Sequence, residues 1–307
     1  MKAPAKHWTR PLALAGTIVA AFQFSGPAHA QDMETIEVNG VTLQYLDQGE
    51  GDPVVFVHGG LSHGSWLAYR DLIPQDYNYI AYVQRYFGDQ PWPDNGENWS
   101  IPTHVDDLIA FVEALDRGPV HLVGWSHGGV VGTHAALERP DLFRSLFFYE
   151  PGGALAQIVP GDDAKAAAKA RLDAFAEADA AIEAGDLDKG MALMIDAIYR
   201  IPGAFADRMT DAQRANLLKN TRLLTVEATA APPPVTCEQL AALDMPTEIV
   251  VGGETWNIYK MIADRLTECM PNAEKLVLQG HTHGAPGLDP ELVGDLIVTF
   301  LREQRGA

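Results

Sequence analysis

Gly124-Trp125-Ser126-His127-Gly128-Gly129 is the stretch that decides the fold. The apolar run 120–123 comes before it, and a helical pattern over 130–139, closed by Pro140, comes after it. A strand, a sharp turn with glycines two before and two after a serine, and a helix form a nucleophile elbow. The pattern predicts that Ser126 stands at the carboxyl edge of a sheet with an exposed hydroxyl.

The residue types around this serine follow from the geometry of the turn. Gly124 and Gly128 leave out side chains that would clash in so tight a turn. The helix that follows presents free N–H groups, which favour developing negative charge. A five-residue pattern also arises by chance, and it is then only a glycine-rich turn with a solvated serine. The strand before it and the helix after it favour the nucleophile.

The rest of the chain alternates between strand and helix patterns. Asn39-Gly40 lies between two alternating runs, 35–38 and 41–46, which is typical of a β-hairpin. Further strands are predicted over 53–57, 77–83, 145–149, 247–251 and 274–278, and helices over 66–72, 103–115, 258–268 and 289–302. This alternation predicts an α/β fold, in which helices cover both faces of a mostly parallel sheet.

The alternation is interrupted in the middle of the chain. From about 162 to 227 the sequence is rich in alanine and helical, with helices predicted over 191–199 and 211–224, and Pro232-Pro233-Pro234 closes it. We therefore expect one core, made of residues 31–150 and 232–307, and an inserted helical segment, residues 151–231.

The first thirty residues have a different character. Lys2, Lys6 and Arg10 accompany an apolar run over 12–24, and Ala28-His29-Ala30 has the small-x-small form of a cleavage site. These features predict a signal peptide over residues 1–30, cleaved after Ala30, and a periplasmic or secreted protein. An uncleaved membrane anchor is the weaker alternative, because the run is shorter than the roughly 20 residues of a spanning helix.

Composition narrows the classes of partner. The chain has 307 residues, 47% of them hydrophobic, and a formal net charge of -19. Such an acidic chain disfavours nucleic acid and anionic membranes as partners. The sequence contains neither G-x-G-x-x-G nor G-x-x-x-x-G-K-[ST], so we expect no nucleotide cofactor. Metal-ligand spacing is also missing among the histidines outside the motifs, so we expect no metal; these are His63, His104, His121 and His134.

Only two cysteines occur, Cys237 and Cys269, and they flank a predicted strand. An exported chain meets an oxidising compartment, where a disulfide can form. The sequence leaves their pairing open. We expect no catalytic role for either thiol, because neither lies in a motif with a partner base.

Side chains able to do chemistry follow the predicted strands. The carboxyl ends of parallel strands meet at one edge of a sheet, so these residues can converge; they are His58, Arg85, Ser126, Glu150, Glu254 and His283. A serine nucleophile needs a histidine base, which in the order Ser, acid, His follows the last strand. Both His281 and His283 are available, and we favour His283, since Gly284 leaves space beside it.

The acid and the oxyanion hole come from the same edge. Glu150 and Glu254 both follow strands from which a carboxylate could reach the histidine. We favour Glu150, because a single carboxylate at the end of an apolar run has no evident structural role there. Glu254 remains the alternative. The backbone N–H groups of Gly60 and His127 are the expected oxyanion hole. The side chain of the neighbouring His58 is expected to brace the loop.

These residues resemble the alpha/beta-hydrolase superfamily over about residues 35–303. The resemblance implies an eight-stranded, mostly parallel sheet with a helical cap inserted after strand 6, here residues 151–231. In most such proteins an aspartate follows strand 7, where this chain has Thr255; in the haloalkane-dehalogenase branch some members place the acid after strand 6, where Glu150 lies. The motifs that carry the resemblance are His58-Gly59-Gly60, Arg85 with Gly88, the nucleophile elbow, and Gly280-x-x-His283.

The resemblance implies a serine hydrolase that cleaves a carboxylic ester or lactone of a small to medium apolar molecule through an acyl-enzyme on Ser126. Chemistry that needs an aspartate nucleophile, as in haloalkane dehalogenases and epoxide hydrolases, is not expected. Carbon–carbon bond hydrolysis, perhydrolase or haloperoxidase-like activity and amide hydrolysis use the same triad and stay open. A ligand-binding receptor with a degenerate site is the alternative from another class.

Overall fold

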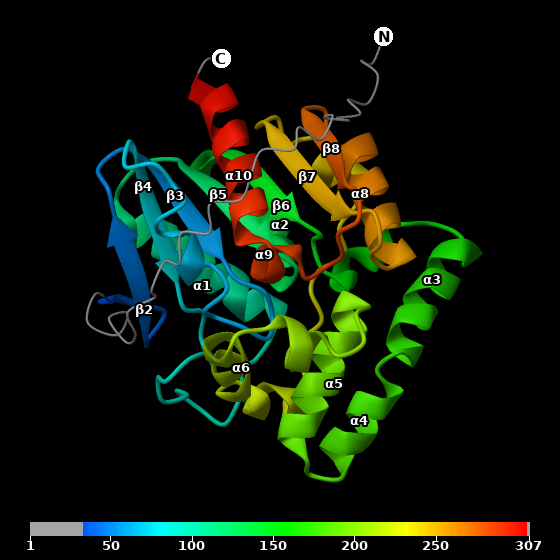
Figure 1. Ribbon diagram of the computed structural model, residues 1–307. Coiled ribbons are helices and arrows are strands. Elements are labelled where there is room, and N and C mark those ends of the chain that lie inside the picture. Colours follow the sequence, from blue (N-terminus) through cyan, green and yellow to red (C-terminus); the bar gives the residue numbers. More distant parts are fainter. Residues whose placement is uncertain (1–32, 306–307) are drawn as a thin grey trace, which may run out of the picture.

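The computed structural model describes residues 33–305, and Figure 1 shows the course of the chain. The predicted signal peptide, residues 1–30, lies outside this range. Eight strands form one sheet in the order β1-β2-β4-β3-β5-β6-β7-β8. The strands are β1 (Glu34–Val38), β2 (Val41–Gln48), β3 (Asp52–Val57), β4 (Tyr77–Tyr82), β5 (Val120–Trp125), β6 (Phe143–Tyr149), β7 (Thr247–Gly252) and β8 (Ala273–Leu278).

The sheet is antiparallel at one edge and parallel elsewhere. β1 and β2 form the hairpin predicted from Asn39-Gly40, with Val38 paired to Val41. Asn39 has φ 47° and Gly40 has φ 74°, the left-handed conformation that tight hairpin turns require. β2 pairs antiparallel to β4, and the strands from β3 to β8 pair in parallel. The expected eight-stranded, mostly parallel sheet is confirmed.

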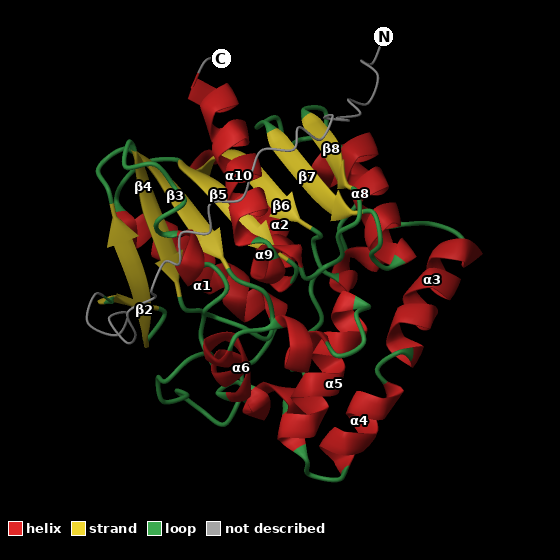
Figure 2. Cartoon of the chain, in the orientation of Figure 1, coloured by secondary structure: helices red, strands yellow, loops and turns green. Residues whose placement is uncertain are grey.

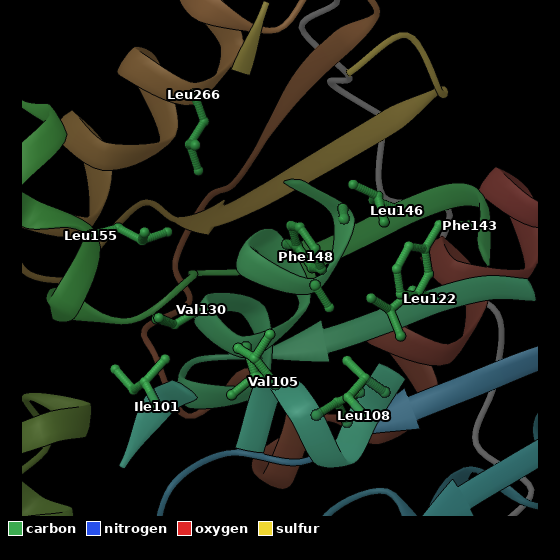
Figure 3. Close-up of a cluster of buried hydrophobic side chains, with 14 of the residues drawn as sticks. Ile101, Val105, Leu108, Leu122, Val130, Phe143, Leu146, Phe148, Leu155 and Leu266 are labelled. Carbon is green, nitrogen blue, oxygen red and sulfur yellow. The ribbon is translucent and has the colours of Figure 1, made fainter. Parts of the chain in front are cut away.

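Helices cover both faces of this sheet (Figure 2). In β3, Val55 and Val57 belong to the core beneath α1, α2 and α8, while Val54 and Phe56 belong to the core beneath α10. Figure 3 shows the first of these cores, where side chains of α1 meet those of β5 and β6. The helices are α1 (Ile101–Leu115), α2 (His127–Glu138), α3 (Asp162–Asp173), α4 (Ala176–Glu183), α5 (Leu187–Tyr199), α6 (Asp211–Leu218), α7 (Cys237–Leu240), α8 (Asn257–Cys269), α9 (Ala285–Leu288) and α10 (Pro290–Arg305).

The segment between β6 and β7 carries α3, α4, α5, α6 and the short α7. Figure 1 shows α4, α5 and α6 grouped beyond the arrowheads of the parallel strands. Met191 and Ile195 of α5 pack in the same buried cluster as Trp125 and Tyr149, the last residues of β5 and β6. α5, with α4 and α6 beside it, therefore lies over the carboxyl edge of the sheet.

Two predicted helices are shorter in the structure. Residues 66–72 contain only a 3-10 turn, Leu67–Tyr69, because tertiary contacts fix this segment: the Nε1 of Trp66 donates to the carbonyl of Val57 at 2.9 Å. The helix predicted over 211–224 ends at Leu218, and a 3-10 turn follows. Asn220 interrupts the predicted helix, because its side-chain oxygen accepts a hydrogen bond of 3.1 Å from the N–H of Gly88.

The two cysteines, whose pairing the sequence left open, form a disulfide between Cys237 and Cys269. It ties the first residue of α7 to the last residue of α8. Within residues 33–305, no helix combines the length and the hydropathy that crossing a membrane requires.

Candidate active site

Ser126 occupies the turn between β5 and α2 in a conformation that few side chains adopt. Its φ is 53° and its ψ is -115°. The glycines around it are required by close backbone approach. A Cβ atom at Gly124 would lie 2.9 Å from the carbonyl oxygen of Gly128, and a Cβ atom at Gly128 would collide with the carbonyl oxygen of Val57. The contact of Gly128 with Val57 brings the end of β3 against the elbow.

The loop after β6 is anchored to the same turn. The N–H of Gly152 donates to the carbonyl of Ser126 at 2.9 Å, and the N–H of Ser126 donates to the carbonyl of Tyr149 at 3.1 Å. Glu150 therefore leaves the sheet directly beside the serine. Its φ of 43° lies in the left-handed region, which is uncommon for a residue other than glycine.

Glu150 and His283 meet in the interior. The Nδ1 of His283 lies 2.7 Å from Oε2 of Glu150, and the two side chains are 2% and 0% exposed. Because a carboxylate only accepts, Nδ1 carries the proton of this bond, and in the neutral form of the imidazole Nε2 keeps its lone pair. A base with this tautomer, held by a carboxylate, has the arrangement that activates a serine hydroxyl.

Two further donors hold the carboxylate of Glu150. The N–H of Gly252 donates to Oε1 at 2.7 Å, and the hydroxyl of Thr255 donates to Oε2 at 2.8 Å. Hydrogen bonds to a buried carboxylate offset the cost of removing it from water. The alternative acid, Glu254, is exposed, and its backbone carbonyl accepts from Nη1 of Arg200 at 3.1 Å. The structure thus brings Glu150, and not Glu254, to His283.

Aromatic rings hold the imidazole of His283. Tyr259 of α8 stacks on it with ring centroids 4.6 Å apart and planes 9° apart. The Nε1 of Trp125 donates to the backbone carbonyl of His283 at 3.1 Å, and the two rings lie 5.8 Å apart. Trp125 immediately precedes Ser126, so it ties the loop that carries His283 to the turn that carries Ser126. Among residues 33–305, Ser126 Oγ and His283 make no direct hydrogen bond, a contact that often tightens only when substrate binds.

Tyr259 is itself held by the inserted segment. Nε of Arg171, on α3, donates to the hydroxyl of Tyr259 at 2.9 Å, and its guanidinium carbon lies 5.3 Å from the tyrosine ring centroid. Burial raises the pKa of Tyr259, so the hydroxyl is neutral. Tyr259, Thr255 and Arg171 were not predicted as site residues, because no local sequence motif marks a residue that acts through another element.

The expected oxyanion donors lie next to each other. A Cβ atom at Gly60 would lie 3.4 Å from the Cβ of His127, and one at Gly59 would lie 3.7 Å from the Cβ of Ser126. In the described part of the chain neither the N–H of Gly60 nor that of His127 donates a hydrogen bond. Two free N–H groups beside Ser126 can hold a negatively charged oxygen.

The remaining residues at this edge have structural contacts. His58 is buried, its Nε2 accepts from the N–H of Gln84 at 3.1 Å, and burial lowers its pKa to about 3. His281 lies 3.1 Å from Oδ2 of Asp289 through its Nε2. Arg85 forms two hydrogen bonds of 2.7 Å with Asp107. In the part of the chain that the structure describes, no group of three potential ligands is arranged to hold a metal ion.

Comparison with known proteins gives this arrangement its context. The model of the alpha/beta hydrolase family matches residues 54–296, a range that contains the elbow, Glu150 and His283. A thermophilic esterase from Thermogutta terrifontis superimposes with a TM-score of 0.68 at 22% identity, covering 89% of this chain and 97% of the esterase. At this identity the likeness concerns the fold alone.

Two curated relatives are similar over shorter segments. (E)-2-((N-methylformamido)methylene)succinate hydrolase of Acinetobacter baylyi is 29% identical over 115 residues, which cover 35% of this chain and 41% of the relative. 2-hydroxy-6-oxo-6-(2'-aminophenyl)hexa-2,4-dienoic acid hydrolase of Metapseudomonas resinovorans is 28% identical over 128 residues, which cover 40% of this chain and 43% of the relative. The chain thus spans less than half the length of each.

Proposed function

Because the chain belongs to the alpha/beta hydrolase family, we propose that it is a serine hydrolase that cleaves a carboxylic ester or lactone through an acyl-enzyme on Ser126. The observation that carries the proposal is the buried contact of 2.7 Å between His283 Nδ1 and Glu150 Oε2. This contact leaves Nε2 of His283 free to act as a base at the elbow. The substrate class is a small to medium apolar molecule with an ester-like carbonyl.

In the proposed reaction Nε2 of His283 takes the proton of Ser126 while Oγ attacks the carbonyl carbon. Glu150 stabilises the imidazolium that forms, and the N–H groups of Gly60 and His127 hold the oxyanion. The tetrahedral intermediate collapses, the C–O bond breaks, and His283 protonates the departing alkoxide. Water then attacks the acyl-enzyme with His283 as base, which releases the acid and restores the serine.

A fluorophosphonate probe tests this proposal, because it labels an activated serine covalently. We expect the native protein to be labelled at Ser126 and to hydrolyse p-nitrophenyl esters and simple lactones. Ser126→Ala should abolish labelling and turnover in a protein whose thermal unfolding is unchanged. Ester turnover that survives in the folded Ser126→Ala variant, or a native protein that resists the probe, would overturn the proposal.

Carbon–carbon bond hydrolysis is the second candidate, and the relative from Metapseudomonas resinovorans supports it. The compound in that relative's name carries hydroxyl, oxo, aminophenyl and acid groups but no ester or amide. Its hydrolysis therefore breaks a carbon–carbon bond. The same Ser126, His283 and Glu150 would act beside a ketone instead of an ester. A panel of p-nitrophenyl esters, lactones and 1,5-diketones separates the two candidates by their kcat/KM values.

We also propose that the protein works outside the cytoplasm, in the periplasm or after secretion. The disulfide between Cys237 and Cys269 supports this, because disulfides persist in oxidising compartments. Cell fractionation of the native host with an antibody against the protein tests it. Recovery of the protein in the cytosol, with residues 1–30 retained, would contradict it.

A further inference from the structure

Three nitrogen-bearing rings meet beside the nucleophile. Trp99 precedes α1, His104 lies in the first turns of α1, and His127 is the residue after Ser126. The ring centroids of Trp99 and His104 are 5.8 Å apart, those of Trp99 and His127 are 6.0 Å apart, and those of His104 and His127 are 5.1 Å apart. We call Trp99, His104 and His127 the ring cluster.

The ring cluster is rich in hydrogen-bonding atoms without partners. Within residues 33–305, the buried atoms Nε1 of Trp99, Nδ1 and Nε2 of His104, and Nε2 of His127 have no hydrogen-bond partner. His104 is fully buried. Buried polar groups in folded proteins are almost always paired, and each exception calls for an explanation such as an absent ligand or water. Four such atoms on three neighbouring rings indicate a binding site for a polar group of a ligand.

The protonation state of the ring cluster determines which polar group it can bind. Burial lowers the pKa of His127 to about 4, and burial together with the neighbouring histidines lowers that of His104 well below its usual value. Both imidazoles are therefore neutral, and each offers one donor and one acceptor, while the indole of Trp99 only donates. The guanidinium of Arg85, whose charge helps to lower the pKa of His104, is engaged with Asp107. A carboxylate would lie there without a compensating charge, whereas a hydroxyl group can donate and accept at once.

The position of the ring cluster connects it to the proposed reaction. His127 supplies one of the expected oxyanion donors, and its Cβ lies next to Gly60, which supplies the other. The carbonyl of Trp99 accepts from the N–H of Thr229, at the end of the inserted segment, at 3.0 Å. The ring cluster thus lies where the oxyanion hole, α1 and the inserted segment meet.

We propose that the ring cluster binds a hydroxyl group of the substrate, a few bonds from the carbonyl carbon that Ser126 attacks. The inference rests on the proposed function and narrows its substrate class to hydroxylated esters or lactones. A site built to pair a hydroxyl rejects the analogue that lacks it, since its own polar groups then stay buried and unpaired. Specificity is therefore the property that the ring cluster controls.

Two substrate series test the proposal. In one, p-nitrophenyl hexanoate is compared with its derivatives hydroxylated at carbon 2, 3, 5 or 6; in the other, benzyl acetate is compared with its 2-, 3- and 4-hydroxybenzyl derivatives. We expect at least one hydroxylated ester to exceed its parent by about 100-fold or more in kcat/KM. That preference should fall below about tenfold in Trp99→Phe and in His104→Phe. Each variant keeps an aromatic ring at its position but removes the unpaired nitrogen atoms of that ring.

His134→Phe is the matched control, because His134 is a buried histidine of α2 outside the ring cluster. It should retain the preference for the hydroxylated ester. The two ring-cluster variants act separately, so one that fails to fold does not remove the test. The inference is overturned if the fluorophosphonate labels native protein at Ser126 but the preference for hydroxylated esters is less than tenfold in both series. In that case the ring cluster holds only water, and the proposed function still stands. Failure to label at Ser126 overturns both.

Discussion

Nδ1 of His283 lies 2.7 Å from Oε2 of Glu150, across 133 positions of the sequence. The bond joins the loop after β8 to the end of β6 and is closed to solvent on both sides. Because the bond is buried, replacing Glu150 would leave Nδ1 of His283 without its acceptor, while Glu150 has two further donors in Gly252 and Thr255. The proposed chemistry depends on this bond more than on any other contact of the site.

Replacing Glu150 by glutamine should lower kcat for ester hydrolysis by about 10³- to 10⁴-fold, because the amide favours the wrong imidazole tautomer and does not stabilise the imidazolium. KM should change little. Glu254→Gln is the matched control, since Glu254 is the exposed carboxylate of the neighbouring loop, and it should stay within about twofold of the native rate. Steady-state kinetics with a p-nitrophenyl ester measure both. Loss of activity in Glu254→Gln with a fully active Glu150→Gln would contradict the assignment of the acid.

Thr255→Val should remove the hydroxyl that donates to Glu150 at 2.8 Å while keeping the shape of the side chain. A hydrogen bond to a charged group contributes about 1.5–3 kcal/mol, so we expect kcat to fall about 10- to 160-fold with KM nearly unchanged. Thr255→Ser keeps the hydroxyl and should recover most of the rate. Equal rates for the valine and serine variants would show that Thr255 does not position Glu150.

Tyr259 should position His283 through its ring and not through its hydroxyl. Tyr259→Leu removes the stacked ring, which contributes about 0.5–1.5 kcal/mol in aromatic pairs, so kcat should fall by about 2- to 12-fold. Tyr259→Phe loses only the hydrogen bond from Arg171 and should keep a rate close to the native one. A phenylalanine variant as impaired as the leucine variant would assign the effect to Arg171 instead.

The disulfide should stabilise the fold without affecting the chemistry. Cys237 and Cys269 are separated by 32 positions, and closing a loop of this length contributes about 3–4 kcal/mol to the free energy of unfolding in the chain-entropy treatment. The double variant Cys237→Ser/Cys269→Ser should lose about that amount in urea unfolding and keep its kcat at 25 °C. Reduced native protein, measured beside it, should match the variant. A variant as stable as the oxidised native protein would contradict this expectation.

The sequence predicts best those features that local patterns encode. Asn39-Gly40 predicts its hairpin, and the alternation of strands and helices predicts the eight-stranded sheet, because turn chemistry and hydrophobic periodicity act over a few residues. Residues 66–72 were predicted wrongly as a helix. Their conformation is set by partners far away in the chain, such as the carbonyl of Pro286, which accepts from the hydroxyl of Tyr69 at 2.9 Å.

The choice between the two carboxylates, Glu150 and Glu254, could not be settled from the sequence. Glu150 and Glu254 follow β6 and β7, which are neighbours in the sheet, so strand order alone gives both the same access to His283. What separates them is the direction of each side chain. Glu150 turns inward with a positive φ and meets donors from Gly252 and Thr255, while the neighbouring Glu254 stays exposed. No pattern of residue types encodes that direction.

The acyl-enzyme itself gives the most direct test of the proposed chemistry. Native protein is mixed with excess p-nitrophenyl butyrate, quenched in acid within milliseconds to seconds, and examined by intact-protein and peptide mass spectrometry. We predict a butyryl adduct on Ser126 that builds up with a burst of p-nitrophenol and disappears as turnover ends. The Ser126→Ala protein should show neither the adduct nor the burst. Steady ester hydrolysis by the native protein with no adduct on Ser126 at any time, together with an active Ser126→Ala variant, would contradict it.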